Sequence, residues 1–200
     1  MIAKAPIAGQ VKTRLCPPLT MAAAAQVAAA ALADTLDAVR ASAADRRVLA
    51  LCGALASIPP GFDIRPQRGD GLGQRLAAAF ADAGPGPVLL IGMDTPQVTA
   101  ALLDDALRRL SQSEAVLGRT LDGGWWGLGL CDVRHAVVLA DVPMSTSATG
   151  ELTDAALRRR GIAVAPLPVH QDVDTSADAY AVAAAAPATR FARALIEASA

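Results

Sequence analysis

Aromatic residues, cysteines and net charge are all scarce in this sequence, and each shortage excludes a class of protein. Aromatic residues make up 3% of the 200 residues and hydrophobic residues 53%, so the core must be built largely from Ala, Leu and Val. The formal net charge of −1 excludes a broad basic surface for nucleic acid or for an anionic membrane. Any positive charge that serves a function must therefore act locally.

The few cysteines and the lack of a long apolar segment indicate the cellular compartment of the protein. Cys16, Cys52 and Cys131 are odd in number and far apart, which argues against a disulfide framework or a metal cluster and favours a reducing compartment. The apolar run Met21–Ala33 is too short and too alanine-rich to span a bilayer, and no signal-peptide pattern is present. We expect a cytoplasmic protein with a single domain over residues 1–200.

Apolar runs alternate with helix-forming segments along the whole chain, and this alternation predicts the fold class. A sandwich of three layers, with helices on both faces of a mostly parallel mixed sheet, is the α/β architecture that such a pattern favours. Expected strands cover Met1–Lys4, Arg47–Cys52, Ile64–Gln67, Pro87–Met93, Ala115–Gly118, Trp125–Leu130 and Ile162–Leu167. Expected helices cover Thr20–Ala41, with Thr20 as N-cap, Gln74–Ala83, Thr99–Leu110, Glu151–Arg160 and two alanine-rich segments at the C-terminus.

A loop punctuated by glycine and proline carries two cations directly after the first expected strand. Such a loop, followed by a helix, is how α/β folds hold nucleotide phosphates, because backbone N–H groups and a helix N-terminus favour an anion. Lys12 supplies a mobile positive charge, and Arg14 can bind two phosphate oxygens at once through its guanidinium group. Gly9 and Lys12 are not adjacent, so this is not a P-loop, and two solvated surface charges remain the alternative. The candidate nucleotide-binding residues are Lys4, Ala5, Pro6, Gly9, Lys12 and Arg14.

Acidic residues follow two of the expected strands and are candidate metal ligands. Asp94 comes at the end of the clearest interior strand, where open α/β sheets bind their ligands. Asp172 and Asp174 alternate on an extended stretch, so both could face one Mg²⁺ or Mn²⁺ ion. Helix capping is the alternative for Asp94. We expect one residue of the Asp172–Thr175 segment to cap the next helix and another to bind metal.

A glycine pair beside two tryptophans is a candidate acceptor site. Asp122-Gly123-Gly124-Trp125-Trp126 could bring backbone close to a ligand and offer an aromatic face to a sugar or base. The alternative is an Asp-Gly hairpin with the tryptophans in the core, one ring on each face of the strand. Gln74 and Arg75, at the expected start of a helix, could reach a base or phosphate, although a solvated helix start fits them nearly as well.

In this order, the segments resemble a known family. Ala3-Lys4-Ala5-Pro6, Val11-Lys12-Thr13-Arg14-Leu15, Gly92-Met93-Asp94-Thr95-Pro96, Asp122-Gly123-Gly124 and Asp172-Val173-Asp174-Thr175 resemble a bacterial family of GT-A-type glycosyltransferases filed as a domain of unknown function. That family belongs to the nucleotide-diphospho-sugar transferase superfamily. More distant similarity extends to molybdenum-cofactor and phospholactate guanylyltransferases. Relatives carry several apolar residues before the first motif, so the native chain is expected either to start upstream of Met1 or to have a stub as its first strand.

The resemblance implies a GT-A-like, Rossmann-like fold and a metal-dependent transferase acting on an NDP-sugar. It assigns Lys12 and Arg14 to the phosphates, and Asp94 and Asp174, with Asp172 beside them, to Mg²⁺ or Mn²⁺. Asp122 is the candidate general base for an acceptor hydroxyl. A nucleotidyltransferase that moves NMP from an NTP to a phosphorylated small molecule is the close rival, and a non-catalytic nucleotide-binding module is the alternative of another class. Expected partners are a nucleotide sugar or NTP and a small-molecule acceptor, with a homodimer left open.

Overall fold

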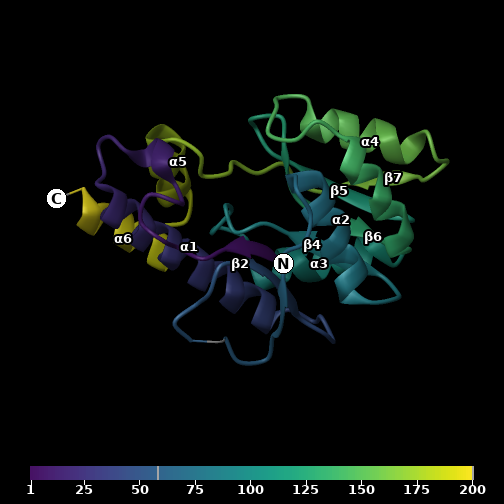
Figure 1. Cartoon of the computed structure of the whole chain (residues 1–200), viewed down its shortest axis with the longest axis horizontal. Helices are drawn as coiled ribbons and strands as arrows, with labels where there is room; N and C mark the ends of the chain where they lie inside the picture. Colours follow the sequence, from purple (N-terminus) through teal and green to yellow (C-terminus); the bar gives the residue numbers. More distant parts are fainter. Residues whose placement is uncertain (58, 200) are drawn as a thin grey trace.

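The structure is a computed structural model that describes residues 1–57 and 59–199. Helices and strands alternate along the described chain (Figure 1). The strands are β1 (Ile2–Lys4), β2 (Val48–Cys52), β3 (Asp63–Pro66), β4 (Val88–Ile91), β5 (Ala115–Arg119), β6 (Trp125–Leu130) and β7 (Val164–Pro166). The α-helices are α1 (Met21–Ala41), α2 (Leu72–Ala83), α3 (Ala100–Leu110), α4 (Thr149–Arg158), α5 (Ser176–Ala185) and α6 (Arg190–Ala198), with 3₁₀ segments at η1 (Thr13–Leu15) and η2 (Val133–Asp141).

The β-structure is mixed, as predicted, but its hydrogen bonds form two ladders. One sheet has the order β1-β2-β3 with parallel neighbours, and the other has the order β4-β6-β5-β7, in which β6 is antiparallel to both β4 and β5. At the junction, the Lys4 amide donates to the Met93 sulfur at 3.3 Å. A strand as short as β1 offers few ladder bonds. A cavity of about 530 Å³ is lined by Met1 and by residues of β2, β4, α1, α2 and α3.

Side chains that alternate along β5 separate the layers of the sandwich. Val116 packs into one cluster with residues of α1 and α3, whereas Ala115 and Leu117 pack into another with residues of α2, η2 and α4. Successive strand residues point to opposite faces of a sheet. The three-layer α/β prediction is therefore confirmed, with α3 on one face and α2 on the other.

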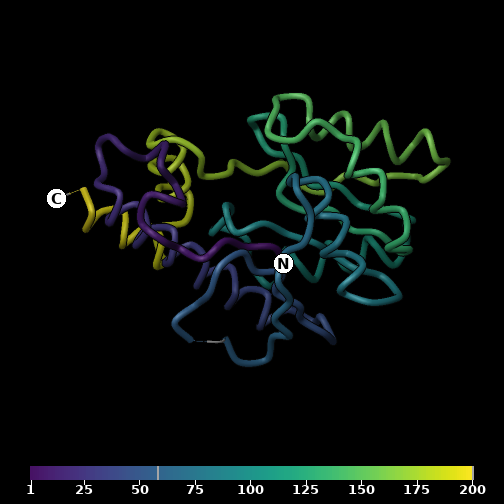
Figure 2. Tube along the Cα trace, viewed as in Figure 1, coloured from purple at the N-terminus to yellow at the C-terminus, as the bar shows by residue number. Residues whose placement is uncertain are grey.

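A third cluster joins the two ends of the chain beside the sheets. Val27 of α1 and Phe191 and Leu195 of α6 are all buried in it, and Figure 2 shows the C-terminal helices lying along α1 at the end of the molecule away from β7. Asp34 of α1 accepts hydrogen bonds from the backbone amides of Arg190 and Phe191, so it caps the start of α6. By length and composition α1 could cross a membrane; in this fold it is a packing helix.

Most predicted elements are present, and the local errors have local causes. Thr20 caps α1 as the sequence indicates, and Thr99, predicted as the first residue of a helix, is the N-cap of α3. Helix α2 begins two residues before the predicted start because Gly73 is a helix residue and not part of a loop. A Cβ at Gly73 would lie 2.0 Å from the Leu139 carbonyl oxygen, so this glycine allows α2 to pack closely on η2. The 3₁₀ segment η2 was not predicted.

Candidate functional site

The opening loop turns sharply and presents Lys12 and Arg14 from a 3₁₀ segment. Gly9 has a φ of 76° and Lys12 a φ of 49°, both in the left-handed region. Arg14 belongs to η1, and α1 does not start until Met21. The helix after the loop starts where the sequence predicts, with Thr20 as its N-cap, but the segment η1 lies between the cations and that helix. Any anion at this loop is held by side chains and loop amides, with Lys4 donating from its ammonium to the Gln10 carbonyl oxygen at 2.9 Å.

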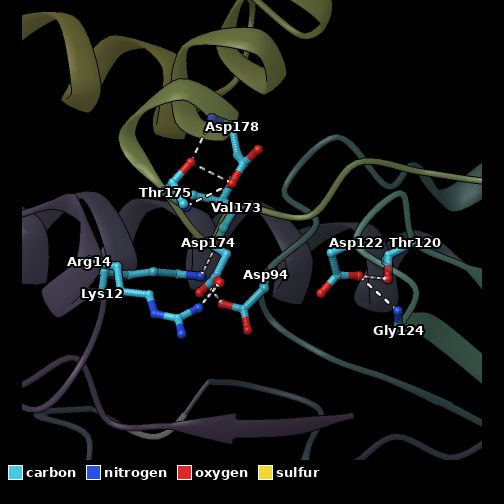
Figure 3. A network of polar contacts seen from close by, with 10 residues as sticks. All are labelled: Lys12, Arg14, Asp94, Thr120, Asp122, Gly124, Val173, Asp174, Thr175 and Asp178. Atoms are coloured by element: carbon cyan, nitrogen blue, oxygen red, sulfur yellow. Dashed lines mark hydrogen bonds and ion pairs between the residues drawn. The ribbon is translucent and has the colours of Figure 1, made fainter. Parts of the chain in front are cut away.

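Lys12 reaches across to the end of β4 and forms an ion pair with Asp94. Its Nζ lies 2.5 Å from Asp94 Oδ1, and the Lys12 side chain is only 10% exposed while that of Asp94 is 50% exposed. The same ammonium donates to the Val173 carbonyl oxygen. The Val173 amide in turn donates to the Asp94 carbonyl oxygen at 2.8 Å. Three distant segments of the chain thus meet at Lys12 (Figure 3).

Arg14 forms a second ion pair, with Asp174, beside the first (Figure 3). The Arg14 side chain is 71% exposed and that of Asp174 is 44% exposed, so water screens this pair and it contributes little stability. Thr175, not Asp174, caps α5, in a capping box with Asp178. The sequence predicts that one residue of the Asp172–Thr175 segment caps the next helix. Because Thr175 is that cap, Asp174 is not needed for capping and its carboxylate can bind a ligand.

Asp172 is half-buried and close to other acids. Burial, then the negative charge of Asp122 and that of Asp94, raises the pKa of Asp172 to about 6. Within residues 1–57 and 59–199, no three His, Cys, Asp or Glu side chains form a ready metal cluster, so the predicted trio of Asp94, Asp172 and Asp174 is not preassembled. Oxygen ligands beside accumulated negative charge suit a hard divalent cation, which phosphates and waters commonly complete. The donor chemistry therefore fits Mg²⁺ or Mn²⁺.

Asp122 sits at the turn of the β5–β6 hairpin, the alternative that the sequence left open. Its Oδ1 accepts from Thr120 Oγ1 at 2.5 Å and from the Gly124 amide at 2.8 Å. Figure 3 shows this group to one side of the two ion pairs. A Cβ at Gly123 would lie 1.8 Å from the Ser147 carbonyl oxygen. This glycine therefore serves the packing of the hairpin against the start of α4, and its role in acceptor binding stays a prediction.

The two tryptophans point to opposite faces of β6, as strand geometry predicts. Trp126 is 2% exposed, and its indole N–H donates to the Pro168 carbonyl oxygen at 2.9 Å. A ring so buried has no free face, so its predicted role in sugar stacking is wrong. Trp125 is half-buried against the cluster on the other face.

Gln74 and Arg75 support the loop before α2. Gln74 Oε1 accepts from the Asp70 amide at 2.9 Å, and Arg75 Nε donates to the Gly69 carbonyl oxygen at 3.1 Å. These bonds use one polar atom of each side chain, and the predicted contact of Gln74 and Arg75 with a nucleotide stays a prediction. Sequence reasoning also missed the Val173 carbonyl oxygen as a partner of Lys12, because a backbone acceptor carries no residue-type signal.

Comparison with known proteins identifies the family. A sequence model of a bacterial family described as "Uncharacterized protein conserved in bacteria (DUF2064)" matches residues 19–146. The chain belongs to this family. The matched span includes Asp94 and Asp122 and leaves the opening loop and Asp174 outside it. No curated protein matches the sequence.

Solved structures share the fold over nearly the whole chain. A protein of Desulfovibrio desulfuricans G20 named "putative nucleotide-diphospho-sugar transferase" is 25% identical, with a TM-score of 0.85 over 98% of this chain and 93% of its own. Rv0371c of Mycobacterium tuberculosis H37Rv, in complex with manganese, is 25% identical, with a TM-score of 0.58 over 90% and 95%. A 2-C-methyl-D-erythritol 4-phosphate cytidylyltransferase of Thermus thermophilus is 18% identical, with a TM-score of 0.53 over 100% and 98%. The GT-A-like nucleotide-diphospho-sugar transferase fold is thereby confirmed.

Proposed function

We propose that this protein is a divalent-metal-dependent glycosyltransferase that uses an NDP-sugar donor. The observation that carries the proposal is the meeting of Lys12–Asp94 and Arg14–Asp174, two cation–carboxylate pairs built from distant parts of the chain. Cations for phosphates and carboxylates for a metal are what such a donor requires. The name of the Desulfovibrio neighbour and the manganese in the Rv0371c structure support both parts of the proposal.

In this proposal the basic residues bind the phosphates and the acidic residues bind the metal ion. Lys12 and Arg14 bind phosphate oxygens of the donor through charge-assisted hydrogen bonds and stabilise the negative charge that develops as the diphosphate leaves. Asp94 and Asp174 hold Mg²⁺ or Mn²⁺, which when bound neutralises that same charge. Asp172 lies within range of the charges of Asp94 and Asp122 and adds to the negative potential that attracts the cation.

Asp122 remains the candidate general base for the acceptor hydroxyl. Hydrogen bonds from Thr120 and from the Gly124 amide orient its carboxylate through Oδ1. An oriented carboxylate that accepts a proton from the attacking hydroxyl would make that oxygen a better nucleophile. Trp125, half-buried on the same hairpin, is the aromatic residue left to contact an acceptor.

Nucleotidyl transfer is the second candidate, and one observation favours it. The fold neighbours include cytidylyltransferases, and the same cations and metal would serve attack on the α-phosphorus of an NTP. Against it, the opening segment has Gly9 and no arginine-rich pyrophosphate loop with two or more glycines. Glycosyl transfer therefore remains the leading proposal.

The released product distinguishes the candidates. The protein with Mn²⁺ is offered a panel of NDP-sugars and, separately, NTPs, each selected by thermal shift and then supplied with acceptor mixtures. Glycosyl transfer releases a nucleoside diphosphate from the sugar nucleotide, and nucleotidyl transfer releases pyrophosphate from the NTP. Release of neither product, with binding retained, indicates a nucleotide-binding module.

A matched pair of variants locates the activity at the proposed site. Asp94→Ala should abolish product release and Mn²⁺-dependent nucleotide binding while leaving the fold intact. Asp132→Ala removes another carboxylate that forms an ion pair, with Arg134, and should behave as wild type. Unchanged Mn²⁺-dependent binding in Asp94→Ala, measured by calorimetry, would refute the metal assignment.

A further inference from the structure

The ammonium of Lys12 occupies a place among oxygen atoms that would also suit a small cation. It lies 2.5 Å from Asp94 Oδ1 and donates to the Val173 carbonyl oxygen. Because the side chain is only 10% exposed, the charge is largely removed from water and depends on these oxygens for compensation. A carboxylate with a carbonyl oxygen is also a ligand pair that hard divalent cations accept.

The segments that carry these two oxygens are joined without help from Lys12. The backbone bond from the Val173 amide to the Asp94 carbonyl oxygen, 2.8 Å long, ties their segments together. Lys12 reaches them from a left-handed backbone position with a φ of 49°, an arrangement that costs free energy in a residue other than glycine. The exposed Arg14–Asp174 pair shows no comparable enclosure.

The residue type at position 12 suits this place. The chain has 18 lysines and arginines together, and lysine stands only at positions 4 and 12. An ammonium is a compact point charge on a flexible stem, whereas a guanidinium is a wide planar fork. Lys12 can therefore fill a cation-sized position and also swing away from it when another anion is offered.

We propose that Lys12 acts as a built-in substitute for the metal ion at Asp94, and that the phosphates of an incoming nucleotide draw it away. The proposal rests on the metal role of Asp94 in the proposed function. A divalent ion binding alone must expel a partly buried ammonium from its partners, because like charges at such distances repel strongly. A phosphate gives Lys12 a new partner, so metal and nucleotide bind with positive coupling, which is reciprocal.

Mn²⁺ binding in the absence of any phosphate directly tests whether Lys12 takes the place of the metal ion. The free ion is followed by its paramagnetic resonance signal during titration of wild type and of Lys12→Met, which keeps most of the length of the side chain and removes its charge. Lys12→Met should bind Mn²⁺ alone more tightly, by a factor within the range of about 5 to 150 that is usual for coupled sites. Arg134→Met removes a positive charge from an exposed ion pair with Asp132 and should match wild type.

Inorganic pyrophosphate completes the test, since it supplies phosphates without requiring a particular base or sugar. It should raise the Mn²⁺ affinity of wild type strongly and that of Lys12→Met much less. Circular dichroism checks the fold, and Lys12→Gln, which retains a hydrogen-bond donor, replaces the methionine variant if that variant fails to fold.

The possible failures are distinguishable. In one outcome, the folded Lys12 variant binds Mn²⁺ alone no more tightly than wild type does, while wild type still responds to pyrophosphate. That result overturns the proposal that Lys12 takes the place of the metal ion, and it leaves the proposed function standing. Failure of wild type to bind Mn²⁺ even with pyrophosphate overturns the metal role of Asp94 and with it both proposals.

Discussion

His170 is a half-buried side chain whose charge state the fold controls. Its Nε2 is buried with no hydrogen-bond partner in the described structure, and its ring meets that of Trp126 edge-on, with centroids 5.3 Å apart. Burial lowers the pKa of His170 below its ordinary value of 6.5. The imidazole is therefore held neutral near pH 7, and its ring acts as part of the packing behind the site.

This lowered pKa predicts how stability depends on pH. The unfolded chain takes up a proton at His170 near pH 6.5, whereas the folded protein resists protonation until a lower pH. The contribution of His170 to the free energy of unfolding should therefore fall as pH decreases from about 7 through the folded pKa. His170→Gln removes the titration, and urea unfolding at several pH values should show a flatter profile. Parallel profiles for the two proteins would contradict the prediction.

The β5–β6 hairpin and helix α4 are fitted together through one glycine. Gly123 has a φ of 91°, and a Cβ there would lie 1.8 Å from the Ser147 carbonyl oxygen and 2.5 Å from its carbon. The Gly150 amide, at the start of α4, donates to the Gly123 carbonyl oxygen at 2.8 Å. The turn that carries Asp122 is thus positioned by contact with a neighbouring element.

Gly123→Ala should destabilise the protein more than an alanine at a glycine with free space around it. Gly61 provides the control, because its φ is also positive, at 80°, and nothing lies within 4 Å of a Cβ there. The left-handed backbone alone costs an alanine about 1–2 kcal/mol. Gly123→Ala adds a backbone clash to this cost. Thermal unfolding measures both variants. Equal losses would show that the contact with Ser147 is readily relaxed.

Local pattern was enough to predict most elements but not how they pair. Apolar runs and the N-cap Thr20 correctly located helices and strands, because these signals reside in neighbouring residues. Gly73 was misread because its role is close contact with η2, far along the chain. The split between the β1-β2-β3 and β4-β6-β5-β7 ladders also depends on distant partners, which local pattern does not report.

At the scale of the whole molecule, the two candidate metal ligands come from distant segments of the described chain and should act as one unit. Once either Asp94 or Asp174 is lost, removal of the other should cost little more Mn²⁺ affinity, because residues that share one ion are not additive. Affinity with bound nucleotide is measured for Asp94→Ala, Asp174→Ala and the double variant. Additive losses would mean that the two carboxylates do not share an ion.

The sequence was enough to name the residues of the candidate site, but it predicted their arrangement in space only in part. Lys12, Arg14, Asp94 and Asp174 were singled out from strand-end positions and a cationic loop, and the structure brings them together. The pairing of each cation with a particular carboxylate was not predicted, because it depends on how three segments cross. The full burial of Trp126 could not be predicted for the same reason: both faces of β6 are covered by distant elements.

The ammonium bond from Lys12 to Val173 joins residues separated by 161 positions, and the Arg14–Asp174 pair joins residues separated by 160. Ordering such distant partners requires closure of nearly the whole chain. Chains emerge from the ribosome with the N-terminus first. A nascent chain therefore exposes its cationic loop long before the residues that enclose Lys12 have been synthesised, and nucleotide-binding competence should appear abruptly once Val173 and Asp174 have left the ribosome.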